Sequence, residues 1–107
     1  MRLRAKTDAN QADIVQALRA AGVSVLSLAP IGNGVPDLLC SYRGYVTLLE
    51  VKMPKQKLRP AQVRWHANWD SYCPIFVVET IGDALIVTRE RWDALPASVR
   101  GPHHPRP

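Results

Sequence analysis

Residues 34–52 read GVPDLLCSYRGYVTLLEVK, a pattern that predicts two short strands, 37–41 and 45–52, joined by a tight turn. Within the second strand, residues 46–49 form a nearly continuous apolar run. Continuous rather than alternating apolarity is typical of a strand covered on both faces of its sheet. Two charged side chains end this strand, and they are out of place in such an environment.

Those charged residues are Glu50 and Lys52, and they point to the same face because side chains alternate along a strand. Asp37 opens the first strand and lies across the hairpin, within reach of Glu50. Two converging carboxylates repel each other unless a positive group lies between them, and a hard divalent cation such as Mg²⁺ is the simplest candidate. The alternative is a surface salt bridge between Glu50 and Lys52 at a strand end.

The flanking sequence predicts helices on both sides of this hairpin. Thr7 or Asp8 can cap a first helix that ends near Ala21 and carries an apolar stripe. Gln11 shares the inward edge of that stripe, so we expect its amide to face the site. The other predicted elements are a strand over 23–28, a helix over 60–72 and a strand over 74–79.

The composition is that of a globular protein with a surplus of basic residues. The 107 residues carry a formal charge of +5, with 47% hydrophobic and 21% charged residues, so we expect one domain with one core. The charge favours a polyanionic partner, either nucleic acid or an anionic surface. Cys40 and Cys73 form no C-x-x-C pair and are interpreted as structural thiols in a reducing compartment.

Several polar and aromatic residues are candidates for contacts with nucleic acid. A basic cluster between the acid pair and the second helix suits a phosphate backbone, and the glycine-containing loop over 29–36 allows a ligand to approach the backbone closely. On the second helix, two tryptophans and His66 share one face with Gln62. We interpret the tryptophans as core and the histidine as structural; base stacking and general-base catalysis are the alternatives. The candidate nucleic-acid contacts are Lys6, Asn33, Lys55, Lys57, Arg59 and Arg64.

Over about residues 8–80, this combination resembles the PD-(D/E)XK nuclease superfamily. Residues 34–38, GVPDL, and 49–52, LEVK, stand in its two signature places. The segment LRPAQ over 58–62, which leads into Trp65, resembles the segment after the signature in VRR-NUC domains, and the first helix resembles the opening helix of archaeal Holliday-junction resolvases. The resemblance implies a single α/β domain with a central mixed sheet flanked by helices, in the order αβββαβ.

The resemblance also implies a site and a reaction. Asp37, Glu50 and the main-chain carbonyl of Val51 would bind Mg²⁺ or Mn²⁺. Lys52 would orient the attacking water, stabilise charge on the phosphate in the transition state or help to deprotonate the nucleophile. Gln62 would hold the water or a phosphate oxygen.

Gln11 stands where the superfamily usually carries a glutamate, and an amide adds no negative charge to the metal site. The leading hypothesis is a metal-dependent endonuclease that cuts branched DNA, above all Holliday junctions, as a homodimer with two sites placed by two-fold symmetry. The alternative is a catalytically weak or inactive DNA-binding module on a nuclease fold. A basic structural or adaptor protein is a third possibility.

The domain is expected to span residues 1–95, followed by a disordered tail over 96–107. Residues 1–6 are interpreted as an extended basic arm or a solvated tail. Within the segment 80–95, residues 84–87 are left open between the end of a helix and an edge strand, and residues 89–95 resemble a short amphipathic helix. No apolar run approaches the roughly 18 residues of a membrane span, and no signal-peptide pattern opens the chain. We therefore expect a cytoplasmic protein; because stand-alone VRR-NUC domains are often found in phages, it could also be phage-encoded and act in a bacterial host.

Overall fold

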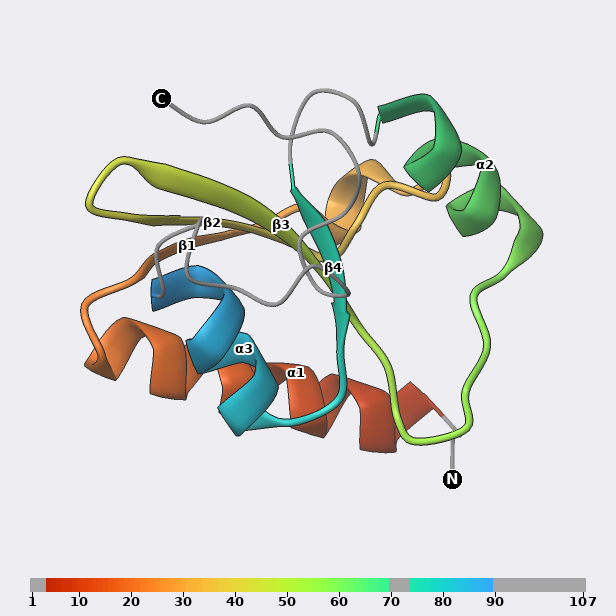
Figure 1. Cartoon of the computed structure of the whole chain (residues 1–107). Helices are drawn as coiled ribbons and strands as arrows, with labels where there is room; N and C mark the ends of the chain where they lie inside the picture. Colours follow the sequence, from red (N-terminus) through yellow and green to blue (C-terminus); the bar gives the residue numbers. More distant parts are fainter. Residues whose placement is uncertain (1–3, 70–73, 90–107) are drawn as a thin grey trace.

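The computed structural model describes residues 4–69 and 74–89. Within these ranges the chain forms a four-stranded sheet flanked by helices (Figure 1). This arrangement confirms the predicted α/β fold and the predicted succession of helix, three strands, helix and strand. The elements are α1 (Arg4–Ala20), β1 (Ser24–Ser27), the short 3-10 helix η1 (Ala29–Ile31), β2 (Leu38–Tyr42), β3 (Tyr45–Val51), α2 (Pro60–Trp69), β4 (Ile75–Val78) and α3 (Ile81–Arg89).

The sheet has the strand order β1-β2-β3-β4 and is mixed. The first three strands are antiparallel neighbours, whereas β4 runs parallel to β3, as a crossover through α2 requires. The β2–β3 hairpin turns at Arg43 and Gly44, whose φ angles of 53° and 82° match the type I′ turn that suits two-residue hairpins. The end of β3 therefore lies in the interior of the sheet, beside the start of β2 and the end of β4.

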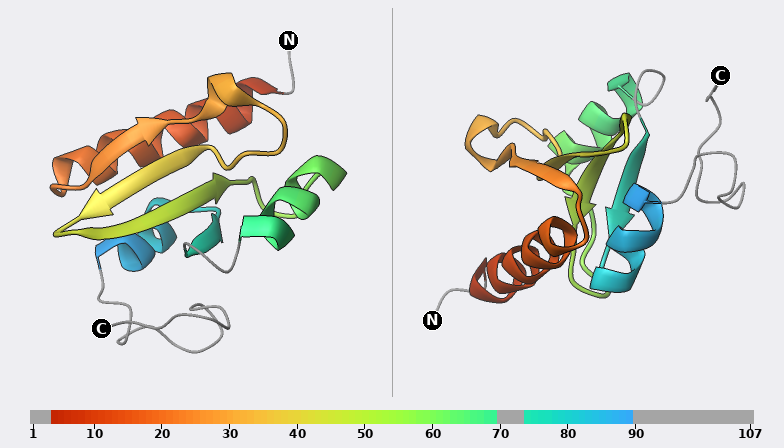
Figure 2. Two further views of the ribbon diagram at one scale, coloured as in Figure 1. Left: turned by 90° about the horizontal axis from the view of Figure 1, so that it is seen from above. Right: turned by 90° about the vertical axis from the view of Figure 1, so that its left-hand side faces the viewer.

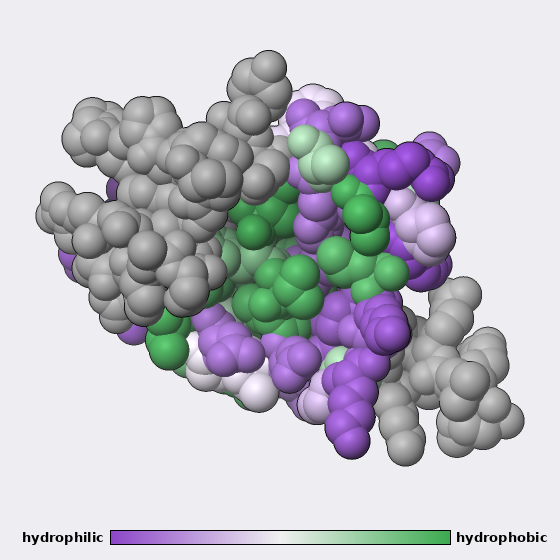
Figure 3. Space-filling view, turned by 45° about the vertical axis from the view of Figure 1, so that its right-hand side comes forward, coloured by the Kyte–Doolittle hydropathy of each residue, from purple (hydrophilic) through white to green (hydrophobic). Residues whose placement is uncertain are grey.

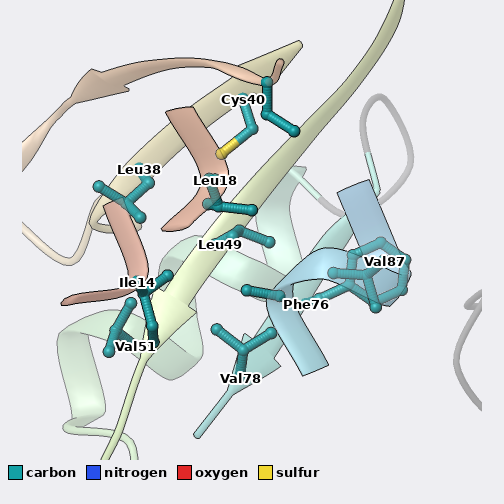
Figure 4. Packing of buried hydrophobic residues seen from close by; sticks show 11 residues of the cluster. Ile14, Leu18, Leu38, Cys40, Leu49, Val51, Phe76, Val78 and Val87 are labelled. Carbon is teal, nitrogen blue, oxygen red and sulfur yellow. The ribbon is translucent and has the colours of Figure 1, made fainter. Parts of the chain in front are cut away.

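The hydrophobic core lies on one face of this sheet, which α1 and α3 cover together (Figures 2 and 4). Cys40 belongs to this core and is 1% exposed, and its burial raises the pKa of the thiol to about 12. This confirms Cys40 as a buried structural thiol, while Cys73 lies outside the described residues. The core residues of the sheet are Leu38, Cys40, Leu49, Val51, Phe76 and Val78, and those of the two helices are Ile14, Leu18, Ala84 and Val87.

The opposite face of the sheet carries α2, which lies near the end of β3 (Figure 2). On this face of the sheet, Leu26, Val46 and Val77 remain 58%, 43% and 49% exposed. An apolar area bordered by hydrophilic side chains is also visible on the face of the molecule shown in Figure 3. The continuous apolar run of β3 predicted that both faces of the sheet are covered. The described helices leave part of the second face exposed to solvent.

Helix α1 begins earlier than the sequence predicted. It starts at Arg4, so the interpretation of residues 1–6 as an extended arm or tail is wrong for residues 4–6. Arginine, alanine and lysine are favourable helix residues, and no breaker separates them from Thr7. The N-terminal basic residues of the described chain therefore extend the helix rather than precede it.

Helix α3 settles the open segment after β4 in favour of a helix. The Asp83 amide donates to Thr80 Oγ1 at 3.0 Å, the contact of an N-cap side chain with the first turn. Residues 90–95 and the expected tail over 96–107 lie outside the described residues. None of the helices in the described ranges combines the length and apolarity needed to cross a membrane.

Candidate active site

Asp37 lies immediately before β2 and is tied to the end of β3. Its Oδ2 accepts a hydrogen bond from the Val51 amide at 2.8 Å. Because Leu38 pairs with Leu49 in the hairpin register, Asp37 comes opposite Glu50 one residue further on. The register therefore brings the two predicted carboxylates to the same end of the sheet.

Glu50 is only 1% exposed, yet it is not part of the hydrophobic core. Its neighbours Leu49 and Val51 occupy the core face, so Glu50 points to the other face. There both carboxylate oxygens meet α2: Gln62 Nε2 donates to Oε2 at 3.0 Å, and His66 Nε2 lies 3.3 Å from Oε1. The charged group is thus buried between the sheet and α2.

Lys52 follows β3 directly and is 5% exposed. Its Nζ donates to Gln62 Oε1 at 2.9 Å, and the same oxygen accepts a second hydrogen bond from the Arg59 amide at 2.8 Å. Gln62 itself is 3% exposed. A single buried amide therefore joins Lys52 to Glu50 and fixes the spacing between the ammonium group and the carboxylate.

The start of α2 is placed by two local features of the sequence. Pro60 occupies the first helical position, and the bond from the Arg59 amide to Gln62 is one half of a capping box. In addition, Gly34 has a φ of +83°, and a Cβ at this position would clash with the Ala61 carbonyl. Only glycine lets the loop before β2 pass so close to α2.

Together these groups line one pocket with a volume of about 470 Å³. It lies between the loop before β2, the end of β3 and the start of α2. Gln11 reaches the same pocket from α1, as its helical position suggested, whereas Asp13 is exposed and does not line it. The predicted site residues in the lining are Gln11, Asp37, Glu50, Val51, Lys52, Lys57, Arg59 and Gln62.

The environment of Asp37 disfavours its negative charge. The pKa of this carboxyl is raised from 3.8 to about 7, mainly by burial and next by a hydrogen bond with the Glu50 side chain. The Val51 amide opposes this shift, the charge of Glu50 adds to it, and the Lys52 ammonium group again opposes it. The two acids therefore compete for the available positive charge.

This donor set fits a hard divalent cation, which binds carboxylate and carbonyl oxygens and would relieve the repulsion between the acids. The chain would supply Asp37, Glu50 and the carbonyl of Val51. Among residues 4–69 and 74–89, no cluster of three or more His, Cys, Asp or Glu side chains is placed to hold an ion. Water and a phosphate oxygen would have to complete the coordination.

Three of the remaining predicted nucleic-acid contacts, Asn33, Lys55 and Arg64, are exposed and lie outside the pocket lining. The fourth, Lys6, lies on α1, and its side chain is not among those that the structure describes.

The structure bears on three sequence-based interpretations of α2. His66, interpreted as structural, contacts the buried Glu50 carboxylate, as a histidine with a hydrogen-bond partner does; its spacing of four residues from Gln62 is the signal that both side chains share one face. Trp65 and Trp69 were interpreted as core, and this is wrong, because neither belongs to the hydrophobic core and Trp69 is 49% exposed. Periodicity identified their common face but not what lies opposite it.

The fold and this pocket define a nuclease-type domain of the PD-(D/E)XK kind. A solved structure described as a VRR_NUC domain is similar to the chain, with 30% sequence identity and a TM-score of 0.62 over 77% of this chain and 95% of that chain. The chain belongs to the VRR-NUC family, as its sequence motifs indicated. No family model matches the sequence, and no curated protein matches it.

Proposed function

We propose that this domain is a metal-dependent endonuclease that hydrolyses phosphodiester bonds in branched DNA, above all in Holliday junctions. The observation that carries the proposal is the burial of Glu50 and Lys52, 1% and 5% exposed, at the wall of one pocket together with Asp37. Burying charges costs several kcal/mol per ion before their partners compensate. Buried charges that line one pocket of a nuclease-type domain are best explained by chemistry on a phosphate.

Mg²⁺ or Mn²⁺ held by Asp37, Glu50 and the Val51 carbonyl would polarise the scissile phosphate and lower the pKa of a bound water. The chain's own contribution is to hold these ligands still. The Val51 amide fixes one oxygen of Asp37, and Gln62 and His66 each contact one oxygen of Glu50. Such contacts to ligand side chains orient them and limit their rotation.

Lys52 is the group that would act on the phosphate or the attacking water. One of its donors is used by Gln62 Oε1 at 2.9 Å, which leaves others for a phosphate oxygen or a water in the pocket. An ammonium group held in this way stabilises the charge that develops in the transition state. Gln62 would serve as a positioning residue, since its amide already contacts both Glu50 and Lys52.

The basic side chains around the pocket would bind the DNA strand on either side of the cut. Lys57 and Arg59 line the pocket, and Lys55 and Arg64 are exposed on the same loop and helix. Contacts of this kind bind phosphates without reading sequence, so recognition by DNA shape follows. A homodimer would place two such sites by two-fold symmetry; sedimentation that finds only monomer at working concentration would contradict paired incision.

The second candidate function is a DNA-binding module with weak or no catalysis. It is favoured by Gln11, which lines the pocket where a carboxylate would strengthen a metal site. This alternative predicts binding of branched DNA without metal-dependent cutting.

The test is cleavage of labelled four-way junctions, flaps and linear duplexes with Mg²⁺, Mn²⁺ or EDTA. Wild type is compared with Lys52→Ala and with Lys55→Ala, which removes the same charge from an exposed position outside the pocket. We expect metal-dependent nicks that Lys52→Ala abolishes. Lys55→Ala should reduce the rate of nicking only a few-fold, the loss expected for one phosphate contact. Tight junction binding by wild type with no nicks under either metal would establish the binding module instead.

A further inference from the structure

The two tryptophans of α2 form an aromatic surface outside the core. Trp65 and Trp69 are one helical turn apart, and their rings are stacked with centroids 5.0 Å apart and planes inclined by 8°. This is the offset arrangement that aromatic pairs prefer. Trp69 is 49% exposed and Trp65 is partly exposed. A stacked pair of indoles near the solvent offers a flat surface on which another planar ring can stack.

This surface adjoins the candidate active site through a chain of contacts. Trp65 meets His66 edge-on, with centroids 6.5 Å apart and planes inclined by 79°, and His66 lies 3.3 Å from Glu50. Along the helix axis, Trp69 is about 10 Å beyond Gln62. A nucleotide close to a phosphate bound in the pocket can therefore reach the tryptophan pair.

The charged side chains on α2 and at its start suit a polyanion. Helix α2 contains no acidic residue, and Arg64 lies on it as an exposed side chain one position before Trp65. At its start, Arg59 lines the active-site pocket. Aromatic rings combined with basic side chains are the means by which proteins hold single strands without reading sequence.

We propose that Trp65 and Trp69 bind an unpaired nucleobase of the strand whose phosphate lies at Glu50 and Lys52. The proposal rests on the proposed nuclease function and specifies its substrate. A base inside a duplex is already stacked on both faces, so only a base from a single-stranded tail, a flap or an opened junction can reach the pair. The enzyme would prefer DNA with unpaired nucleotides next to the cut.

The test is DNA binding measured by fluorescence anisotropy in EDTA, so that no cleavage interferes. Three probes are compared: a blunt duplex, the same duplex with a single-stranded thymine tail, and the same tail with abasic sites. The variants are Trp69→Ala, Trp69→Phe and, as a matched control on the same helix, Val63→Ala, which removes a 52% exposed apolar side chain. Thermal melts confirm that each variant is folded.

Wild type should bind the thymine tail about tenfold more tightly than the blunt duplex or the abasic tail, as expected for one stacked base. Trp69→Ala should abolish this difference and leave binding of the blunt duplex unchanged, whereas Trp69→Phe and Val63→Ala should retain it. Equal affinity of wild type for all three probes, or an equal loss on all of them in Trp69→Ala, would overturn the proposal.

Cleavage by wild type of a labelled four-way junction and a flap with Mg²⁺ separates this proposal from the nuclease function. A tail preference that depends on Trp69 without any cleavage would leave the aromatic site standing and reject the nuclease. Cleavage without a tail preference would reject the aromatic site alone.

Discussion

Near its end, β3 presents two faces that are both shielded from solvent. On one face, Leu49 is 0% and Val51 is 1% exposed beneath α1 and α3; on the other, Glu50 is 1% and Lys52 is 5% exposed next to α2. The first face is filled by close-packed apolar side chains. The second holds charges that are connected through the Gln62 amide. Burial alone therefore does not distinguish a core from a site.

The difference lies in what each face contributes to the free energy of unfolding. Burial of apolar side chains stabilises the fold by roughly 25 cal/mol for each Å² removed from water. Buried charges lose hydration, and their partners at best compensate for that loss. We infer that the core face stabilises the domain, whereas the site face is retained for function at little gain or some cost in stability.

The largest expected effect is a difference in the free energy of unfolding between substitutions at two neighbouring residues of β3, one on each face. Leu49→Ala should lower the free energy of unfolding by about 3 kcal/mol, through lost burial and a cavity. Glu50→Gln keeps the shape of the side chain and relieves the repulsion with Asp37. It should change the free energy of unfolding by less than about 1 kcal/mol. Urea unfolding in EDTA measures both, and an equal loss in the two variants would remove the distinction between the faces.

The approach of the loop to α2 gives the next largest effect. Gly34→Ala places a Cβ against the Ala61 carbonyl at a φ of +83°, so we expect it to destabilise by about 2 kcal/mol and to displace the start of α2. The control is Gly44→Ala, which has a φ of +82° but no atom within 4 Å; it should cost about 1 kcal/mol from backbone strain alone. Thermal unfolding that ranks the two variants equally would contradict a packing role for Gly34.

A smaller effect is the pH dependence of stability without metal. The folded protein holds the Asp37 proton up to about pH 7, whereas the unfolded chain releases it near 3.8. Between these values the folded state binds more protons, so this group's contribution to stability falls as pH rises through the window. Urea midpoints in EDTA should show this slope in wild type, and Asp37→Asn should reduce it; an unchanged slope would mean that Asp37 is ionised throughout.

The smallest predicted effect concerns the amide at the edge of the pocket. Gln11→Glu adds a carboxylate to the lining shared by Asp37 and Glu50, so the Mg²⁺ concentration for half-maximal cleavage should fall about fivefold. Gln16→Glu adds the same charge on α1 outside that lining and should have little effect. If both variants respond alike, the effect of Gln11→Glu is one of net charge and not of the site.

The sequence was sufficient to predict the four strands, the first two helices and the placement of the central charges, but it left α3 open. Period-two alternation put Glu50 and Lys52 on one face, and hairpin pairing put Asp37 opposite Glu50. Helical periodicity directed Gln11 toward the pocket. These predictions worked because each depends on local geometry that every strand or helix shares.

What the sequence could not predict depends on the elements that meet in space. Periodicity grouped Trp65, His66 and Trp69 on one face of α2, but it could not reveal that Glu50 lies opposite His66 or that the tryptophans lie outside the core. The apolar run of β3 similarly could not show that Val46 stays 43% exposed. Such contacts depend on how α2 lies against the sheet, and the close approach of Gly34 to Ala61 helps to place the start of this helix.

The most direct measurement is single-turnover cleavage of branched DNA with Mg²⁺ by Glu50→Gln, with Leu49→Val as the variant of the adjacent core position. Both proteins should be folded, and Glu50→Gln should cut at least about 10³-fold more slowly than wild type, because the charge that it removes serves the reaction. Leu49→Val should cut at nearly the wild-type rate despite its lower stability. Cleavage at the wild-type rate by folded Glu50→Gln would contradict the assignment of this face as the active site.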